Sequence, residues 1–253
     1  MRSIVLIAFI AALCAVVCIE GFAIKPTITI KKISDDTKSP INDALCPTCV
    51  DLLDFGLADL MAALDAGTVY SCLSLCNYVS PLGPYAVEGC DVICTAIGVN
   101  AFIDVIKKAD LDPIYGCQLA KICPIHDCTA KVCALVDTVG VVPSSGPAGG
   151  KYSFYSRLNV LNESGPGEVT LEVTGTSIAK NQVVYRYYQA SGFKPGVYGI
   201  KFQIDTSGDD GQDWFPGAYH AKVNVCEGEC GSWIKRPHTR LLASGVANFT
   251  ITG

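Results

Sequence analysis

The chain has 253 residues, of which 24 are acidic and 19 are basic, so its formal net charge is −5. The charge is uneven: residues 41–125 carry ten acidic residues against three lysines, a net charge of −7, whereas residues 126–253 carry eleven of each sign. Neither part has the basic stripe that displaces counterions from nucleic acid, so we expect no nucleic-acid partner.

Residues 1–23 have the pattern of a secretory signal peptide. Arg2 precedes an apolar run from Ile4 to Ile19, and small residues follow up to Ala23, where we expect cleavage. A membrane-spanning helix needs about 20 apolar residues, so this run is too short to favour one. Two of the 14 cysteines leave with the peptide. We therefore expect an extracellular protein, or alternatively one in a lysosome or acidic vesicle, whose cysteines pair as disulfides.

Residues 24–40 are predicted to form an N-terminal arm, in which Thr27–Ile30 alternates like a strand that could dock on another part of the protein. From Asn42 onward the spacing of the apolar residues changes to that of an α-helix. Apolar residues recur at three- and four-residue steps, which indicates amphipathic helices. We expect them from Asn42 to Gly67, over Thr68–Tyr78, from about Tyr85 to Lys108 with a bend near Gly98, and from Asp112 to Lys121.

The C-terminal part has the period of strands. Residues 137–150 are rich in Pro, Gly and Ser and are predicted to be a linker. Residues 151–253 are predicted to form an antiparallel β-sandwich, since strand patterns recur between turn signals. The predicted strands are Tyr152–Leu161, Glu168–Gly175, Gln182–Gln189, Val197–Asp205, Tyr219–Cys226 and Val246–Thr252.

Eight cysteines lie between Cys46 and Cys123. A pair four residues apart on a helix places both thiols on one face. Two such helices, antiparallel across the loop Ser80–Pro84, would bring Cys76 opposite Cys90, and the flanking cysteines nest in the same order. The predicted disulfides are Cys46–Cys123, Cys49–Cys117, Cys72–Cys94 and Cys76–Cys90.

The remaining cysteines leave alternatives open. Cys128–Cys133 and Cys226–Cys230 are interpreted as local disulfides, with cross-links between the two domains as the alternative. A zinc site from Cys128 and Cys133 with His126 and either His220 or His238 has usable ligand types, but its spacing matches no familiar site. Cys46-Pro-Thr-Cys49 resembles a redox motif but lacks the βαβ context that this chemistry uses. We expect no metal and no cofactor.

The order of six cysteines resembles that of the saposin B-type family: Cys46-x-x-Cys49, a central pair Cys76 and Cys90, and Cys117-x5-Cys123. This resemblance implies a five-helix leaf over residues 41–136 that handles lipid. The additional pair Cys72 and Cys94 departs from the usual pattern and should stiffen the central hairpin. Any opening toward lipid is then expected to hinge near Ala66-Gly67 and Gly98.

Motifs of other kinds are few. The chain has three histidines and no Gly-x-Ser-x-Gly elbow, so we predict no enzymatic activity and no catalytic residues. The acidic loop 205–213 offers oxygen ligands but lacks the ordered spacing of an EF-hand, so a plain hairpin loop is the favoured interpretation over calcium. Asn162 and Asn248 begin glycosylation sequons.

Over nearly its whole length the chain resembles countin and countin-like proteins of social amoebae, through the helical module, the segment Cys226-Glu-Gly-Glu-Cys230-Gly and the ending Ala247–Thr252. The resemblance implies a secreted, non-enzymatic component of a multiprotein factor that limits the size of cell groups. Lipid or membrane binding by the helical domain is the expected physical means, alongside protein partners in a secreted complex. The alternative function is an endolysosomal lipid-transfer or membrane-perturbing effector.

Overall fold

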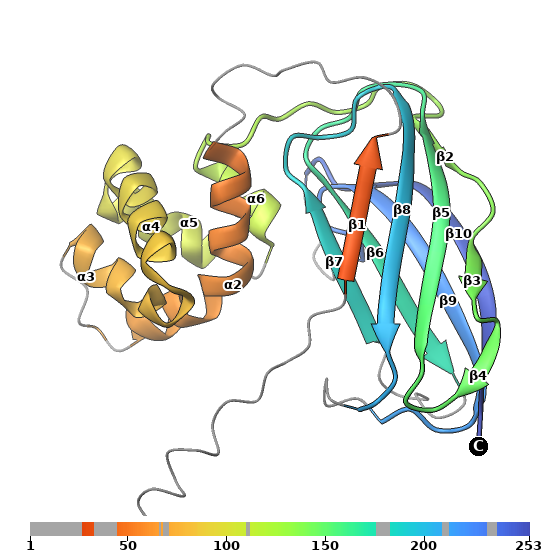
Figure 1. Ribbon diagram of the computed structural model, residues 1–253. Coiled ribbons are helices and arrows are strands. Elements are labelled where there is room, and N and C mark those ends of the chain that lie inside the picture. Colours follow the sequence, from red (N-terminus) through yellow and green to blue (C-terminus); the bar gives the residue numbers. More distant parts are fainter. Residues whose placement is uncertain are drawn as a thin grey trace, which may run out of the picture.

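The computed structural model describes most of the chain. The described residues are 27–32, 45–65, 67, 71–109, 112–175, 183–208, 213–231 and 237–253. The predicted signal peptide (1–23) and most of the predicted arm (24–40) lie outside them. Within them the structure has a group of helices followed by two β-sheets (Figure 1), which agrees with the expected order of α and β parts.

The helical domain, residues 45–119, contains five α-helices and one 3-10 helix in its described residues. Helix α2 buries one side, which includes Leu53, Leu57 and Leu60, against the other helices. The alternation of buried and exposed positions therefore follows the predicted amphipathic pattern. The bounds are α2 (Leu45–Asp65), α3 (Cys72–Cys76), the 3-10 helix η2 (Asn77–Leu82), α4 (Pro84–Ile97), α5 (Val99–Ala109) and α6 (Pro113–Leu119).

The helix predicted over Thr68–Tyr78 is wrong in its bounds. Ser71 caps α3, because its hydroxyl accepts the Ser74 N–H at 3.2 Å while the Ser74 hydroxyl accepts the Ser71 N–H at 2.9 Å. This capping box starts the α-helix at Cys72. After five residues the chain tightens into η2, which contains Pro81.

Local sequence explains the other helix ends. Pro113 occupies the first turn of α6, and the Asp112 carboxylate accepts the Tyr115 N–H at 2.8 Å, so this cap satisfies a backbone donor that has no partner inside the helix. Gly98 has φ +88° and separates α4 from α5, and the helix axis bends by 110° between them. Among the described residues no single helix is long and apolar enough to cross a bilayer, and the α4–α5 pair meets that criterion only in this bent form.

Four nested disulfides cross-link the helical domain. Cys72–Cys94 and Cys76–Cys90 join α3 to α4 as two rungs, with Cα atoms 5.6 and 5.5 Å apart. Cys46–Cys123 and Cys49–Cys117 join the start of α2 to α6 and the segment after it. Together they tie the first helix to the last, which supplements a core too small to be very stable alone.

The β-domain contains two five-stranded sheets, which we call sheet A and sheet B. Sheet A has the order β1 (Thr27–Lys32), β8 (Gly196–Asp205), β5 (Lys151–Val160) and β2 (Ala134–Val136), with β3 (Gly140–Val142) also paired to β5. Sheet B has the order β4 (Ser145–Pro147), β10 (Arg240–Thr252), β9 (Gly217–Glu227), β6 (Gly167–Gly175) and β7 (Val183–Gln189).

The two sheets share one hydrophobic core. Phe154 and Phe202 contribute to it from sheet A, and Tyr219 and Phe249 from sheet B. The Phe249 ring lies edge-on to Phe154 at 5.3 Å and stacks on Tyr219 at 5.2 Å between ring centroids. These contacts explain the alternating pattern of the sequence, because the outward positions between the buried ones are polar or exposed.

Two of the predicted domain boundaries are wrong. Residues 137–150, predicted as a linker, contain β3 and β4, and β2 lies inside the range predicted for the helical domain. These strands have three residues each, too few to show a period, and their hydrogen-bond partners β5 and β10 come later in the chain. The connection between the domains is therefore the earlier segment 120–133.

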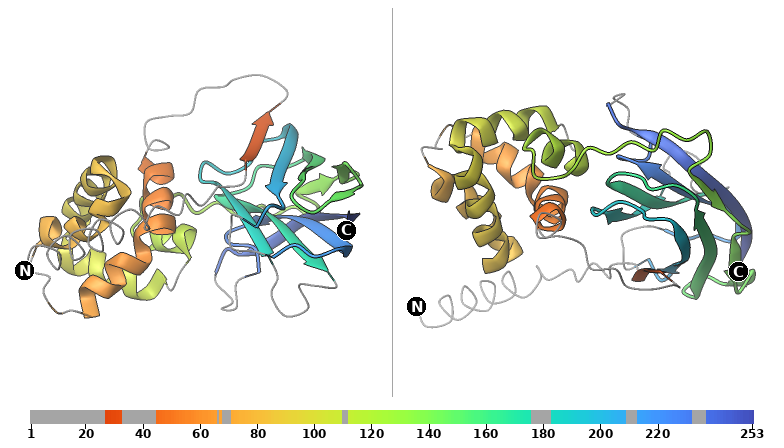
Figure 2. Two further views of the ribbon diagram at one scale, coloured as in Figure 1. Left: turned by 60° about the horizontal axis from the view of Figure 1, so that its bottom comes forward. Right: turned by 90° about the horizontal axis from the view of Figure 1, so that it is seen from above.

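Part of the predicted arm is a strand of the β-domain. Strand β1 pairs antiparallel with β8, from Thr27 opposite Gln203 to Lys32 opposite Tyr198. Ile28 and Ile30 pack against the hydrophobic core of the two sheets. The chain thus begins its described part in the β-domain, forms the helices, and returns to the β-domain (Figures 1 and 2).

Gly116 offers a test of the packing between helices. A Cβ atom at this position would lie 2.6 Å from Cδ1 of Leu53 and 2.9 Å from Cβ of Ala109. We expect Gly116→Ala to lower the free energy of unfolding by about 1–3 kcal/mol through overpacking, measured by urea denaturation. The control is Gly89→Ala, whose Cβ would meet only a methyl of Thr48, at 3.2 Å. In a helix this change should be neutral or stabilising, and an equal loss for both variants would contradict the prediction.

Candidate functional site

A groove of about 430 Å³ opens on the surface of the helical domain between α2 and α4. Its residues come from one side of α2, from the end of η2 and from the first two turns of α4; they are Thr48, Asp51, Leu52, Phe55, Leu82, Tyr85, Ala86 and Gly89. Gly89 lets the two helices approach closely, since a Cβ there would lie 3.2 Å from a methyl of Thr48. The groove therefore follows from a small residue at a helix crossing.

The edge of the groove carries large apolar side chains. Phe55 is 49% exposed, Leu82 is 42% exposed and Tyr85 is 86% exposed. Leu73 and Val92, on α3 and α4, are also exposed. Single exposed apolar residues are common, but a group of them around a concave site marks a surface that binds an apolar partner. The groove is a candidate site for an apolar ligand.

The surroundings of the groove are acidic. Asp51 lines the groove itself, and the exposed acidic residues of the helical domain also include Asp54, Asp59 and Glu88. Their carboxylates give this surface a negative potential at neutral pH, which is screened at physiological ionic strength beyond about 8 Å. A ligand or surface that approaches the groove therefore meets negative charge.

The helical domain contacts the β-domain through the end of β7. Tyr188 and Ala190 pack against the hydrophobic core of the helical domain. The Sγ atom of Cys46 lies 3.1 Å from the carbonyl oxygen of Ala190, a close contact without a shared hydrogen, because Cys46 is in a disulfide. Figure 1 shows α2 and α6 on the side of the helical domain that faces β7.

Several buried carboxyl groups meet beside this contact. Glu168 on β6 is fully buried, and its Oε2 accepts the Cys230 N–H at 2.5 Å. Its Oε1 lies 3.6 Å from Nε of Arg186, an ion pair too long for a hydrogen bond. Arg186 also forms an ion pair with Glu229. Asp112, which caps α6, is 1% exposed and adds negative charge from the helical domain.

The pKa values of this cluster follow from burial. Burial raises the pKa of Glu168 to about 8; Arg186 opposes this rise, while Glu229 and Asp112 add to it. Burial also raises the pKa of Tyr188, and the nearby carboxylates of Glu168 and Asp54 raise it further. The junction of the two domains thus favours the protonated form of Glu168.

The Cys226–Cys230 disulfide closes a loop whose two glutamates have separate roles. Glu227 accepts the N–H groups of Cys128 and Gly165 at 2.7 and 3.2 Å, and Glu229 pairs with Arg186. Sequence reasoning identified the cysteines and missed both glutamates. Nothing in the sequence around the two glutamates indicated that they are buried, because acidic residues are usually exposed to solvent.

The segment before the β-domain is fastened to it by further side chains. Arg240 donates to the carbonyl oxygens of Cys128 and Ala130 at 2.9 and 3.2 Å. Nδ1 of His238 lies 2.7 Å from Oδ2 of Asp127.

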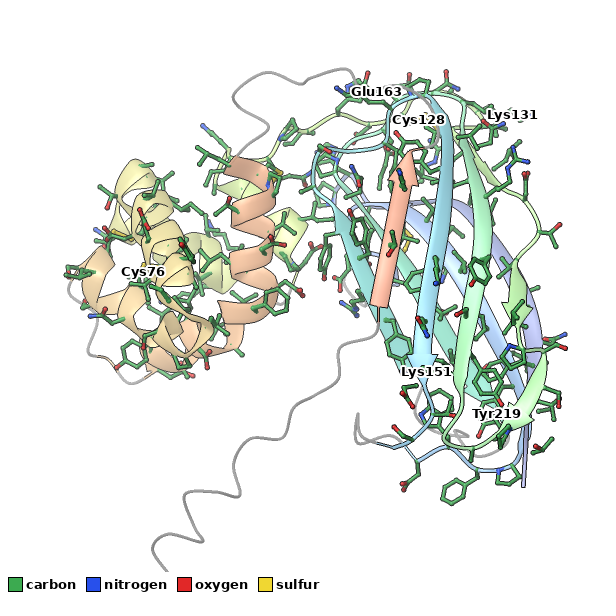
Figure 3. The ribbon with its side chains drawn as sticks, in the orientation of Figure 1. Cys76, Cys128, Lys131, Lys151, Glu163 and Tyr219 are labelled. Atoms are coloured by element: carbon green, nitrogen blue, oxygen red, sulfur yellow. A yellow bond between two sulfur atoms is a disulfide. The ribbon has the colours of Figure 1, made fainter. Side chains whose placement is uncertain are left out.

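Figure 3 marks the two ends of the β-domain. Cys128 lies near Glu163 and Lys131 at one end, and Lys151 and Tyr219 lie toward the other.

The candidate metal ligands are not brought together. Cys128 and Cys133 form a disulfide with a Cα separation of 6.2 Å, so neither is a thiolate ligand, and His220 contacts Asn248 instead. The described residues contain no group of three or more His, Cys, Asp or Glu that could hold a metal ion. Within the predicted acidic loop, Asp205 pairs with Lys151 at 3.8 Å, and residues 209–212 lie outside the described residues.

Both sequon asparagines are exposed. Nδ2 of Asn162 donates to the carbonyl oxygen of Val132 at 3.0 Å, and Oδ1 of Asn248 lies 2.6 Å from Nδ1 of His220. Glycosylation at these positions stays a prediction.

Two known domain families match most of the length of the chain. Residues 44–121 match the Countin N-terminal domain and residues 134–253 match the Countin C-terminal domain. The chain is 32% identical to Countin-1 of Dictyostelium discoideum over 210 residues, which cover 82% of this chain and 78% of Countin-1. It is 30% identical to Countin-3 of the same organism over 210 residues, which cover 81% of this chain and 89% of Countin-3.

Solved structures are matched at low similarity. A β-glucosidase from Erythrobacter marinus gives a TM-score of 0.31 at 13% identity, covering 47% of this chain and 15% of the enzyme. An alkylpurine DNA glycosylase from Pseudomonas fluorescens gives a TM-score of 0.37 at 15% identity, covering 81% of this chain and 52% of the glycosylase. Scores this low carry no argument about fold or function.

The raised pKa of Glu168 predicts how stability depends on pH. The pKa of about 8 in the folded protein exceeds the ordinary value of 4.5 for a glutamate, so the stabilisation is fully present below pH 4.5 and is lost as the pH rises through about 8. We expect Glu168→Gln to flatten the stability profile between these values, because glutamine cannot ionise. Thermal unfolding at pH 5 to 9 measures this, with the exposed Glu163→Gln as control. An unchanged profile in Glu168→Gln would exclude Glu168 as the source.

Proposed function

Because the chain belongs to the countin family, we propose that it is secreted and acts outside the cell as a non-enzymatic signalling protein that helps to limit the size of cell groups. The similarity to Countin-1 and Countin-3 over most of the chain supports this proposal. Six disulfides among the described residues agree with an oxidising compartment. Such a protein works by binding, so its surfaces are the parts that carry function.

We further propose that the helical domain binds lipid through the groove between α2 and α4. The supporting observation is the exposed apolar edge formed by Phe55, Leu82 and Tyr85. Transfer of apolar surface from water to lipid is worth about 25 cal/mol per Å². A saposin-like leaf would bind lipid in this way, by exposing more of its apolar faces.

Charge sets the conditions under which this binding occurs. The net charge of −7 over residues 41–125 repels anionic bilayers at neutral pH, at about 1 kcal/mol per charge near the surface. Protonation of the carboxylates in an acidic compartment relaxes this repulsion. Binding to anionic membranes is therefore stronger in acid.

A second candidate function is a lipid-transfer or membrane-perturbing effector in a lysosome or acidic vesicle. The buried carboxyl cluster at the domain junction favours it. Glu168, with a pKa of about 8, stabilises the fold more at acidic than at alkaline pH. The two functions differ in where the protein acts and share the same lipid-binding groove.

Vesicle binding tests the groove. We expect Leu82→Ser together with Tyr85→Ser to weaken binding to anionic vesicles at pH 4.5 by tenfold or more, measured by co-sedimentation, since these side chains are already exposed and contribute little to folding. The control is Phe215→Ser, which removes an apolar side chain of the β-domain that is 55% exposed. Equal binding of the unaltered protein at pH 4.5 and 7.5 would contradict the role of the acidic surface.

Native mass spectrometry of the gently purified protein separates the two functions. We expect the protein in conditioned medium, in a large complex with other proteins, with bound lipid and with glycans at Asn162 and Asn248. Recovery from acidic vesicles as a lipid-bound monomer would favour the effector instead. A secreted monomer free of lipid and partners would contradict both.

A further inference from the structure

The outer face of sheet A carries a second surface, distinct from the groove in the helical domain. Strands β1, β8 and β5 lie side by side across this face (Figure 1), and β3 pairs with the far side of β5. Tyr152 and Phe154 point into the core, so Tyr155 and Arg157 point outward on the pleated strand. A shallow groove of about 560 Å³ crosses the exposed side.

The strand register places three cations around this groove. Lys31 on β1 and Arg157 on β5 both lie opposite Gly199 of β8. Neighbouring strands are about 4.8 Å apart, so the two cations flank Gly199 at roughly 10 Å between their Cα atoms. Lys201 lies two residues further along β8, opposite Tyr155. Gly199 has no side chain, which leaves the floor between the cations open.

An aromatic ring completes the surface. Tyr155 is 45% exposed, and Nζ of Lys201 lies 5.6 Å from the centre of its ring. On the other side of Tyr155 its partner in β3 is Gly140, which again leaves the neighbouring position without a side chain. The groove thus combines an exposed aromatic ring with an open floor, a shape that accepts a saturated ring whose apolar C–H face packs on the tyrosine.

The charges of the groove favour an anion. The described residues that line it include Lys31, Arg157 and Lys201 and no aspartate or glutamate. Among the described residues, Asp137 is the carboxylate paired with these cations, at 3.9 Å from Arg157, and both side chains are more than half exposed. An exposed pair of this kind contributes about 0–1 kcal/mol and yields readily to a better ligand. This contrasts with the acidic helical domain of the same chain.

We propose that the outer face of sheet A binds an acidic polysaccharide, one whose sugars carry sulfate or carboxylate groups. The sugar ring stacks on Tyr155, and Lys31, Arg157 and Lys201 bind its anionic groups. A membrane fits less well, because the groove offers cations and one ring in place of a protruding apolar surface. The N-terminal strand β1 supplies Lys31, so the site is complete only when β1 is paired with β8.

The test uses the full secreted protein with heparin as a highly sulfated probe and dextran as a neutral one. We expect heparin to bind with an affinity that falls as salt rises, and dextran not to bind. Lys31→Gln with Lys201→Gln should weaken heparin binding by tenfold or more and reduce its salt dependence. Tyr155→Ser should weaken it severalfold without changing the salt dependence, since the ring carries no charge.

A matched control separates a site from general charge. Lys131→Gln with Lys222→Gln removes the same two charges from exposed positions away from this groove, and should leave heparin affinity unchanged. An equal loss in both double variants would overturn the proposal. So would unaltered binding in Tyr155→Ser, or tighter binding of polyglutamate or anionic vesicles than of heparin through the same residues.

Discussion

The placement of the two domains depends on the loop closed by the Cys226–Cys230 disulfide. Glu227 holds the connecting segment 120–133 by accepting the N–H of Cys128, and it also accepts the N–H of Gly165 between β5 and β6, while Glu229 holds Arg186 of β7, the strand next to the helical domain. Removing one partner of a buried, hydrogen-bonded charge is strongly destabilising, since it leaves the other group unpaired. Two acidic side chains in a five-residue loop therefore hold together the connecting segment 120–133, sheet B and the surface of the β-domain that contacts the helices.

The same junction links the architecture to pH. Arg186 faces Glu168 and Glu229 within the β-domain, while Asp112 contributes negative charge from the helical domain. Carboxyl groups thus outnumber this guanidinium, and burial makes the protonated form of Glu168 the stable one. We propose the same direction for lipid binding by the helical domain, where fewer negative charges in acid would lower the repulsion from anionic lipid. Acidity acts on both the junction and the proposed lipid-binding surface in the same direction.

The two domains present surfaces of opposite chemistry. The helical domain offers an apolar groove in acidic surroundings, and sheet A offers a basic groove with an exposed tyrosine. Strand β1 is the first described element, precedes the helices in sequence and forms an edge of sheet A. The two proposed binding sites lie on different domains, so an apolar partner at one would not compete with an anionic partner at the other.

The sequence by itself determined the helix and strand positions of the longer elements, because burial of one face imposes a period of 3.6 on α2 and of 2 on β5 or β9, and that period is visible in the residues. Cysteine spacing likewise indicated the four nested pairs of the helical domain, since antiparallel helices bring such pairs together, whereas for Cys128–Cys133 and Cys226–Cys230 it left cross-links between the domains as an alternative to the local pairs that the structure contains. Only the tertiary structure decided the docking of β1, the three-residue strands, the buried roles of Glu168 and Glu227, and the grouping of Lys31 with Arg157 and Lys201. The partners of β1 lie more than 160 residues away in the chain, and those of Glu168 and Glu227 lie more than 60 residues away, and a contact at such a distance leaves no local pattern.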